Sequence, residues 1–202
     1  MRKLEVWQLP IAGLWWLKRR MRYLFWGYYN RLAGPLKFEW VGKMVKFNGR
    51  VEVEHPFSKI RIGDNSMIGV RCYFLAKPPG SIILGKNVFI NDNCYITSCY
   101  GITIGDNVAI AENVSIRDYD HEFSDTTVPI SSQGLRGAPI RIGEDVWIGR
   151  GVMITSGVTI GRGCVVGANA VVTKNLPDWS IAVGNPARVI RNRLHQKLAS
   201  VV

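Results

Sequence analysis

Residues 140–173 read IRIGEDVWIGRGVMITSGVTIGRGCVVGANAVVT, and an aliphatic side chain returns at every sixth position of this stretch. The series consists of Ile142, Ile148, Ile154, Ile160, Val166 and Val172. A period of six fits neither an α-helix of about 3.6 residues per turn nor a strand that alternates its two faces. It fits a short strand followed by a tight turn, repeated so that the same aliphatic side chain always points inward.

The same spacing extends over most of the chain on the N-terminal side of this stretch. Aliphatic residues keep the register at Ile62, Ile68, Leu84, Ile90, Ile96, Ile104, Ile110 and Ile116. A small or medium side chain stands four residues after most of the aliphatic residues, and it also points inward in such a repeat. These side chains are Ser66, Cys72, Val88, Cys94, Val108, Val114, Val146, Val152, Val158, Cys164 and Ala170.

Three such units close one triangular coil, and coils stacked about 4.8 Å apart hydrogen-bond to those above and below. Glycine follows many of the aliphatic residues, because a corner brings backbones close together and permits unusual φ angles. Residues 61–174, less one long loop, amount to about six coils. We therefore predict a mainly β protein built on a parallel β-helix. A right-handed β-helix or a β-sandwich with an accidental period is the alternative.

The two ends of the chain differ from the repeat. Residues 1–50 hold 11 of the 26 Lys and Arg residues but only two acidic ones, so they carry most of the formal net charge of +11. Five of the seven tryptophans also lie there. We divide the chain into a partly helical, aromatic and basic segment (1–59), the β-helix (60–176) with a loop at 117–139, and a short C-terminal tail (177–202).

The four cysteines indicate packing rather than metal binding. Cys72, Cys94 and Cys164 occupy the small inward position of the repeat, where a cysteine behaves as a small apolar residue, while Cys99 lies outside that register. The chain has no C-x-x-C pair and no histidines at zinc spacing, so we expect no metal cofactor. The apolar run at 9–17 is too short to span a bilayer and lacks a cleavage site, so we expect a cytoplasmic protein.

The repeat is interrupted at residues 117–139, RDYDHEFSDTTVPISSQGLRGAP. Loops of this length inside a compact domain are usually functional or disordered. This loop contains His121, one of three histidines in the chain, and the neighbouring Asp118, Asp120 and Glu122. We interpret these three carboxylates as solvated loop charges. Asp118 or Asp120 is also able to orient the imidazole of His121, and a backbone carbonyl would serve equally well.

This combination resembles the hexapeptide-repeat acyltransferase superfamily, and within it the sugar O-acetyltransferases of the galactoside and maltose group. Their catalytic histidine follows a coil similar to IGDNVAIAENVSI, residues 104–116 here. An asparagine stands 30 residues earlier in a segment similar to FINDNCYI, which matches Asn91 and His121. The resemblance implies a left-handed β-helix, which has the shape of a three-sided prism, and acetyl-CoA as co-substrate. It also implies a homotrimer with each site between the prisms of two neighbouring chains.

The chemistry of acyl transfer explains why such a pair is needed. A neutral imidazole with a pKa near 7 takes the proton of the attacking hydroxyl, which contributes on the order of 10²–10⁴ in rate. The amide of Asn91 would hydrogen-bond the acceptor, and backbone N–H groups would stabilise the oxyanion. With no activated serine or cysteine evident, the resemblance implies direct transfer from acetyl-CoA to a sugar hydroxyl.

A second stretch, GANAVVTKNLPDWSIAVGNPARVIRNR at 167–193, resembles the last coil and tail of the family, beside the acetyl-CoA groove. Carried over by position, Trp147 flanks the pantetheine arm. Lys and Arg side chains suit the phosphates of CoA because they form charge-assisted hydrogen bonds. The remaining positions implied by the resemblance are Ala168 and Thr173 beside the pantetheine, and Lys174, Arg188 and Arg191 at the phosphates, with Arg150 as a weaker candidate.

The segment LPIAGLWWLKRRMRYLFWGYYNRLAG at 9–34 does not resemble the N-terminal domain of the free-sugar acetyltransferases. One hypothesis is a helix that lies on an anionic membrane surface through residues 1–50. Another is a helical cap on the open end of the prism, and nucleic-acid binding ranks last. Membrane contact at the inner face would suit a lipid-linked or cell-surface glycan as the acceptor.

Three other functions compete with sugar O-acetylation. An N-acetyltransferase of amino sugars or antibiotics uses the same scaffold, and a non-catalytic β-helix scaffold would have lost the chemistry. A carbonic anhydrase needs three histidine ligands for zinc, and His55, His121 and His195 lie far from the required spacing. We therefore reject the carbonic anhydrase and keep the other two as alternatives.

Overall fold

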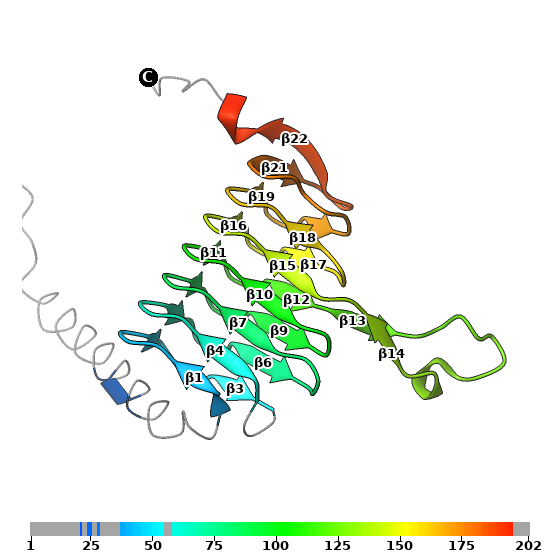
Figure 1. Cartoon of the computed structure of the whole chain (residues 1–202), viewed down its shortest axis with the longest axis horizontal. Helices are drawn as coiled ribbons and strands as arrows, with labels where there is room; N and C mark the ends of the chain where they lie inside the picture. Colours follow the sequence, from blue (N-terminus) through cyan, green and yellow to red (C-terminus); the bar gives the residue numbers. More distant parts are fainter. Residues whose placement is uncertain (1–20, 22–23, 26–27, 29–36, 55–57, 196–202) are drawn as a thin grey trace, which may run out of the picture.

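The computed structural model describes residues 21, 24–25, 28, 37–54 and 58–195 of the chain. Most of them form a solenoid whose three sides are parallel β-sheets (Figure 1). Sheet A comprises β1 (Trp40–Val41), β4 (Ile60–Ile62), β7 (Ile82–Leu84), β10 (Ile102–Ile104), β15 (Ile140–Ile142) and β18 (Thr159–Ile160).

The other two sheets run alongside. Sheet B comprises β2 (Lys46–Phe47), β5 (Met67–Ile68), β8 (Phe89–Ile90), β11 (Ala109–Ile110), β16 (Trp147–Ile148), β19 (Val165–Val166), β21 (Ser180–Val183) and β22 (Arg188–Asn192). Sheet C comprises β3 (Glu52–Val53), β6 (Tyr73–Ala76), β9 (Tyr95–Ser98), β12 (Ser115–Arg117), β17 (Met153–Ile154) and β20 (Val171–Val172). The last strand, β22, runs antiparallel to β21 and is followed by the short 3₁₀ helix η2 (Arg193–His195).

The repeat sets the register of these sheets. In sheet A, Ile104 pairs with Leu84 on one side and with Ile142 on the other, and all three side chains are buried. The same stacking in sheets B and C fills the interior with aliphatic side chains from six coils. The prediction of a parallel β-solenoid with about six coils is therefore confirmed.

The solenoid begins before the expected boundary at residue 60. Trp40 and Val41 pair with Arg61 and Ile62, and the strands β2 and β3 pair with β5 and β6 in the same way. Residues 40–53 are thus the first coil rather than part of a separate segment. In the sequence, this first coil is indicated by a less typical form of the same period, with Val41, Phe47 and Val53 six residues apart.

The corners show why the sequence IGDN recurs. A Cβ atom on Gly63 would lie 2.2 Å from the carbonyl oxygen of Gly85, so glycine is required by close approach of backbones. The unusual φ expected for such glycines falls instead on the asparagine two residues later, as at Asn65 (φ 59°), because asparagine tolerates the left-handed region. Between them the aspartate binds the adjacent coil: Asp106 Oδ1 accepts a hydrogen bond from Lys86 N at 2.7 Å.

The buried cysteines pack as predicted and also form hydrogen bonds. The thiols of Cys72, Cys94 and Cys164 are at most 1% exposed. Each donates to a carbonyl of the next coil, with S···O distances of 3.1 Å to Asn91, 3.2 Å to Ala111 and 3.0 Å to Pro177. A weak S–H donor at this position thus satisfies a corner carbonyl that would otherwise face an apolar side chain.

The long interruption of the repeat is an ordered β-hairpin. Strands β13 (Tyr119–His121) and β14 (Leu135–Gly137) pair antiparallel, and η1 (Ile130–Ser132) lies in the loop that joins them. We call residues 118–138 the arm, which projects far from the prism (Figure 1). The loop expected over 117–139 thus begins and ends in paired strands, in which side chains alternate with a period of two instead of the six-residue repeat.

Most of the expected N-terminal helix lies outside the described residues. The described positions Met21, Leu24, Phe25 and Tyr28 are helical, and their side chains are exposed. Among the residues that the structure describes, no helix is long and apolar enough to cross a bilayer.

Candidate active site

The arm presents His121 to solvent. His121 is the last residue of β13 and pairs with Leu135 of β14. Its side chain and that of Asp120 are exposed, as expected for Asp120. An accessible imidazole in this position is able to exchange protons with a bound substrate or with water.

Glu122 is more than a solvated charge. Its Oε1 accepts hydrogen bonds from the backbone N of Phe123 at 2.8 Å and of Ser124 at 3.0 Å, and Arg136 lies 3.7 Å away. These hydrogen bonds, together with the nearby guanidinium, lower the pKa of Glu122 below its ordinary value. Because Arg136 also lies over the ring of Phe123, at 4.3 Å from its centre, the segment next to His121 is well braced.

Asp118 departs most from the sequence interpretation. It is fully buried rather than solvated. Its Oδ2 accepts hydrogen bonds from Ser98 Oγ at 2.7 Å, Tyr100 N at 3.0 Å and Gly101 N at 2.6 Å. Its Oδ1 accepts one from Cys99 N at 2.7 Å. The carboxylate therefore faces the corner 98–101 of the preceding coil and does not orient His121 directly.

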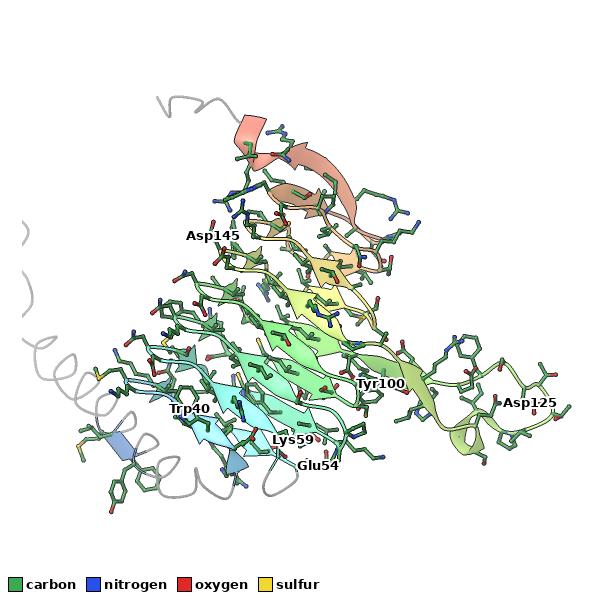
Figure 2. The ribbon with its side chains drawn as sticks, in the orientation of Figure 1. Trp40, Glu54, Lys59, Tyr100, Asp125 and Asp145 are labelled. Carbon is green, nitrogen blue, oxygen red and sulfur yellow. The ribbon has the colours of Figure 1, made fainter. Side chains whose placement is uncertain are left out.

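The two ends of the arm, Asp118 and Ala138, form what we call its neck. The neck is also held by hydrogen bonds from the next coil. Ser156 Oγ donates to Asp118 O at 2.8 Å and accepts from Ala138 N at 2.8 Å, so one hydroxyl joins the two ends of the arm. Tyr100, at the foot of the arm in Figure 2, donates its hydroxyl to Leu135 O at 3.2 Å. The sequence interpretation missed these contacts, although alternation from buried Ile116 would have placed Asp118 inward.

Asn91 and His121 do not meet within one chain. Asn91 is exposed at the corner between β8 of sheet B and β9 of sheet C. His121 follows β12 and so leaves the prism at the other end of sheet C. No described hydrogen bond or ion pair joins the two residues. The two residues therefore lie at different corners of the prism.

The expected acetyl-CoA residues gather on the last coils, but on more than one side. Trp147 is 56% exposed on β16. Pairing runs from Trp147 to Val165, from Val165 to Ile181 and from Ile181 to Arg191, so Trp147 and Arg191 share one row of sheet B. The other expected residues are exposed as well: Arg188 on β22, Ala168 after β19, and Thr173 and Lys174 after β20 of sheet C. Arg150, the weaker candidate, pairs with Glu112 at 3.5 Å.

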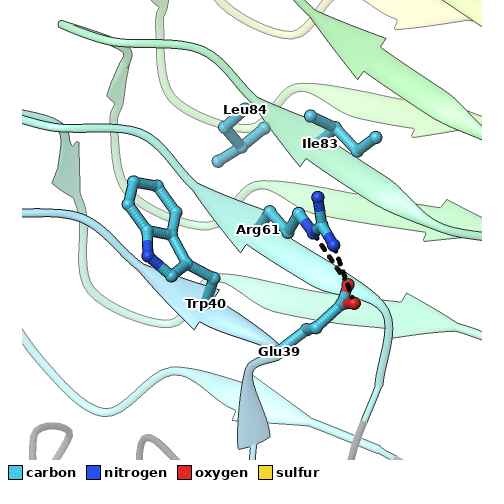
Figure 3. Close-up of a pocket in the computed structure, with 5 residues that line it drawn as sticks. All are labelled: Glu39, Trp40, Arg61, Ile83 and Leu84. Atoms are coloured by element: carbon cyan, nitrogen blue, oxygen red, sulfur yellow. Dashed lines mark hydrogen bonds and ion pairs between the residues drawn. The ribbon is translucent and has the colours of Figure 1, made fainter.

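A separate hollow of about 570 Å³ lies on the outer face of sheet A, near the first coils (Figure 3). It is lined by Trp40 and by the ion pair between Arg61 and Glu39, whose two N···O distances are both 3.0 Å. This hollow is remote in sequence from the arm. In the described part of the chain, no three His, Cys, Asp or Glu side chains lie close enough together to hold a metal ion.

Two family descriptions match the repeat. "Bacterial transferase hexapeptide (six repeats)" matches residues 139–174, and "Hexapeptide repeat of succinyl-transferase" matches 59–98 and 81–117. The matches lie on both sides of the arm, where the coils are regular.

Named relatives extend the similarity over most of this chain. The probable acetyltransferase Rv3034c of Mycobacterium tuberculosis is 37% identical over 197 residues, which cover 92% of this chain but 64% of the relative, so the chain spans less than two thirds of that protein. Galactoside O-acetyltransferase of Escherichia coli is 40% identical, with 69% and 70% of the two chains covered. The putative lipopolysaccharide biosynthesis O-acetyl transferase WbbJ of Escherichia coli is 34% identical, with 68% and 74% covered.

Solved structures of other transferases are similar to this chain in fold. The N-acyltransferase AntD of Bacillus cereus, in complex with dTDP and coenzyme A, superposes with a TM-score of 0.71 at 27% identity over 81% of this chain and 89% of AntD. The acetyltransferase VCA0836 of Vibrio cholerae, complexed with acetyl coenzyme A, gives 0.56 at 32% identity over 67% and 71%. Fold, repeat and relatives together define a hexapeptide-repeat transferase. The chain belongs to the hexapeptide-repeat acetyltransferase superfamily.

Proposed function

We propose that this chain transfers an acetyl group from acetyl-CoA to a sugar hydroxyl, with His121 as the general base. The position of His121 carries the proposal, because it is exposed on an arm that is tied to the prism by a buried carboxylate. The motif around it, and its spacing from Asn91, resemble those of the sugar O-acetyltransferases. The 40% identity to galactoside O-acetyltransferase supports the same reaction class.

In the proposed reaction the imidazole of His121 takes the proton of the acceptor hydroxyl while the oxygen attacks the thioester carbonyl. The tetrahedral intermediate collapses as the C–S bond breaks, and CoA leaves as a thiol with the proton returned by the imidazolium. Asn91 of a second copy would hydrogen-bond the acceptor hydroxyl. Backbone N–H groups would stabilise the oxyanion.

Direct transfer is favoured over an acyl-enzyme. Burial, together with the charge of Asp118, raises the pKa of the half-buried Cys99 thiol, which lowers its thiolate fraction at neutral pH. The other three cysteines are buried in the core and donate to carbonyls. None of these thiols has the electropositive, accessible surroundings of a nucleophile.

Acetyl-CoA would bind along the last coils, with its pantetheine beside Trp147, Ala168 and Thr173. Its phosphates would meet Lys174, Arg188 and Arg191. The homotrimer and the left-handed winding belong to the same proposal. Since Asn91 and His121 leave the prism at different corners, an assembly that brings neighbouring copies together would complete each site.

A cell-surface or lipid-linked glycan is the acceptor that we propose. The identity to WbbJ supports a glycan of this kind. The described helical positions Met21, Leu24, Phe25 and Tyr28 expose apolar side chains. They stand within the basic segment 1–50, a combination that favours peripheral binding to an anionic bilayer at the inner face of the membrane.

Membrane contact is tested by flotation with vesicles of phosphatidylcholine alone and of phosphatidylcholine with phosphatidylglycerol. We expect binding only to the anionic vesicles, with loss at high salt. Leu24→Glu should abolish it, whereas Leu135→Glu, at an exposed site on the arm, should not. Equal recovery with neutral vesicles, or none with either kind, would contradict the proposal.

Transfer to an amine is the second candidate. The match to AntD, an N-acyltransferase described with dTDP and coenzyme A, favours it. A base is needed there as well, because an ammonium group must lose a proton before it attacks. Matched sugars with a hydroxyl or an amine at the same carbon discriminate the two reactions.

The deciding experiment combines binding with turnover. We expect acetyl-CoA to bind at one site per chain, by calorimetry, in both the native protein and His121→Ala. Release of free CoA with hydroxyl sugars should require His121. Absence of binding to either protein would indicate a β-helix scaffold without the chemistry, whereas turnover only with amine sugars would establish N-acylation.

A further inference from the structure

We propose that Asp118 is a positioning residue, whose carboxylate fixes the neck of the arm and thereby the placement of His121. This inference rests on the proposed function, because it concerns how the base is held. A fully buried carboxylate needs partners for its charge, and Asp118 finds them outside the arm. All four donors belong to residues 98–101, in the coil that precedes its own.

The opposite side of the neck is tied to the following coil. Ser156 Oγ bridges Asp118 O and Ala138 N, and Gly157 N donates to Ala138 O at 3.0 Å. The two ends of the arm are therefore held between the coil of β9 and the coil of β17. A hairpin attached at both sides in this way has little freedom to pivot about its neck.

This hold reaches His121 through three residues of paired strand. Tyr119, next to Asp118, pairs with Gly137, and His121 pairs with Leu135. The hydroxyl of Tyr100 binds Leu135 O, directly opposite His121. A Cβ atom on Gly137 would lie 2.1 Å from Asp118 O, so the two strands are in close contact at the neck.

The register of the solenoid does not depend on the hydrogen bonds of Asp118 and Ser156 at the neck. Coils on either side of the arm pair directly: Ile104 with Ile142, Ile110 with Ile148, and Ile116 with Ile154. Those ladders lie beside the neck rather than through it. Loss of the Asp118 carboxylate is thus expected to release the arm more than it disturbs the stacking of coils.

The test compares turnover with acetyl-CoA affinity. Asp118→Asn replaces a charged acceptor by an amide whose NH₂ faces backbone N–H groups. We expect kcat to fall on the order of 10²-fold, the effect of about 1 Å of misplacement of a catalytic group. The calorimetric Kd for acetyl-CoA should stay unchanged, since the residues proposed to bind it lie on the last coils.

A double-mutant cycle separates positioning from a general structural role. If Asp118 acts through His121, Asp118→Asn should slow the His121→Ala protein no further. Equal slowing in both backgrounds would refute the inference while leaving the proposed function intact. Full activity of His121→Ala itself would instead refute His121 as the base in the proposed function.

A second pair of variants keeps the test decisive if Asp118→Asn fails to fold. Ser156→Ala removes the bridge across the neck and should lower kcat without changing the acetyl-CoA Kd. The control is Thr155→Val, because Thr155 also donates its hydroxyl to a carbonyl, that of Val172 at 3.1 Å, but not to the arm. Equal kcat for the two variants would overturn the proposal.

Discussion

Substitution of Gly63 by alanine tests the account of the corners most directly. The added Cβ would lie 2.2 Å from Gly85 O and 2.3 Å from Gly85 C, which are backbone atoms that cannot rotate away. Relief requires the two coils to separate locally by about 1 Å, which breaks the hydrogen bond from Gly63 N to Leu84 O, now 2.9 Å. Overpacking costs about 1–3 kcal/mol, and a lost backbone hydrogen bond adds about 0.5–1.5. We therefore expect Gly63→Ala to lower the free energy of unfolding by about 1.5–4.5 kcal/mol.

The matched control is Gly167→Ala, since Gly167 also follows an inward aliphatic residue. Its Cβ would meet Val183 Cγ1 at 2.7 Å, a methyl group that moves with a side-chain rotation. We expect a cost below about 1.5 kcal/mol there. Urea denaturation followed by circular dichroism measures both variants. Equal destabilisation, within about 0.5 kcal/mol, would refute close backbone approach as the reason for glycine at Gly63.

Three further outcomes are expected. His121→Ala should cost about 3–5 kcal/mol of transition-state stabilisation in kcat/KM with an unchanged circular dichroism spectrum; full turnover would end its assignment as the base. Arg188→Ala should raise the calorimetric Kd for acetyl-CoA more than it lowers kcat at saturation, because an ion pair to phosphate is lost; the reverse pattern would contradict the proposed groove. The lowered pKa of Glu122 makes its contribution to the arm present above the ordinary glutamate pKa and lost as the pH falls through the folded-state value. Amide exchange at Phe123 and Ser124, corrected for intrinsic rates, should therefore rise at acid pH, and a flat profile would contradict it.

The solenoid was predictable because its determinants are local and repeated. One inward aliphatic residue in six specifies each strand, and many copies in register outweigh any single irregular unit. The first coil was missed although Val41, Phe47 and Val53 keep the period of six and Gly42 follows Val41. Close approach of backbones at Gly63 was expected from the repeat, whereas the position of the positive φ, at Asn65 rather than at the glycine, needed coordinates.

The site was less predictable because its geometry is not local. The motif and spacing indicate His121, but nothing in RDYDH distinguishes the buried Asp118 from the exposed Asp120, because alternation from Ile116 places both on the same face. The partners of Asp118 lie 17–20 residues earlier in the chain, and Ser156 lies 38 residues later. The assignment of acetyl-CoA contacts, and of Asn91 as a partner of His121, stays a prediction because each concerns a ligand or a second copy.

The arm enters and leaves the prism at a single corner, between coils that pair as though it were absent. Loop-closure entropy grows only slowly with length, so an insertion at such a corner costs little and leaves the core unchanged. Residues 122–134, between the two paired strands, can therefore be lengthened or shortened while His121 and the neck at Asp118 and Ala138 are kept. The prism thus forms a constant frame, and the tip of the arm is the segment in which a change of length would leave both the core and the position of His121 unaltered.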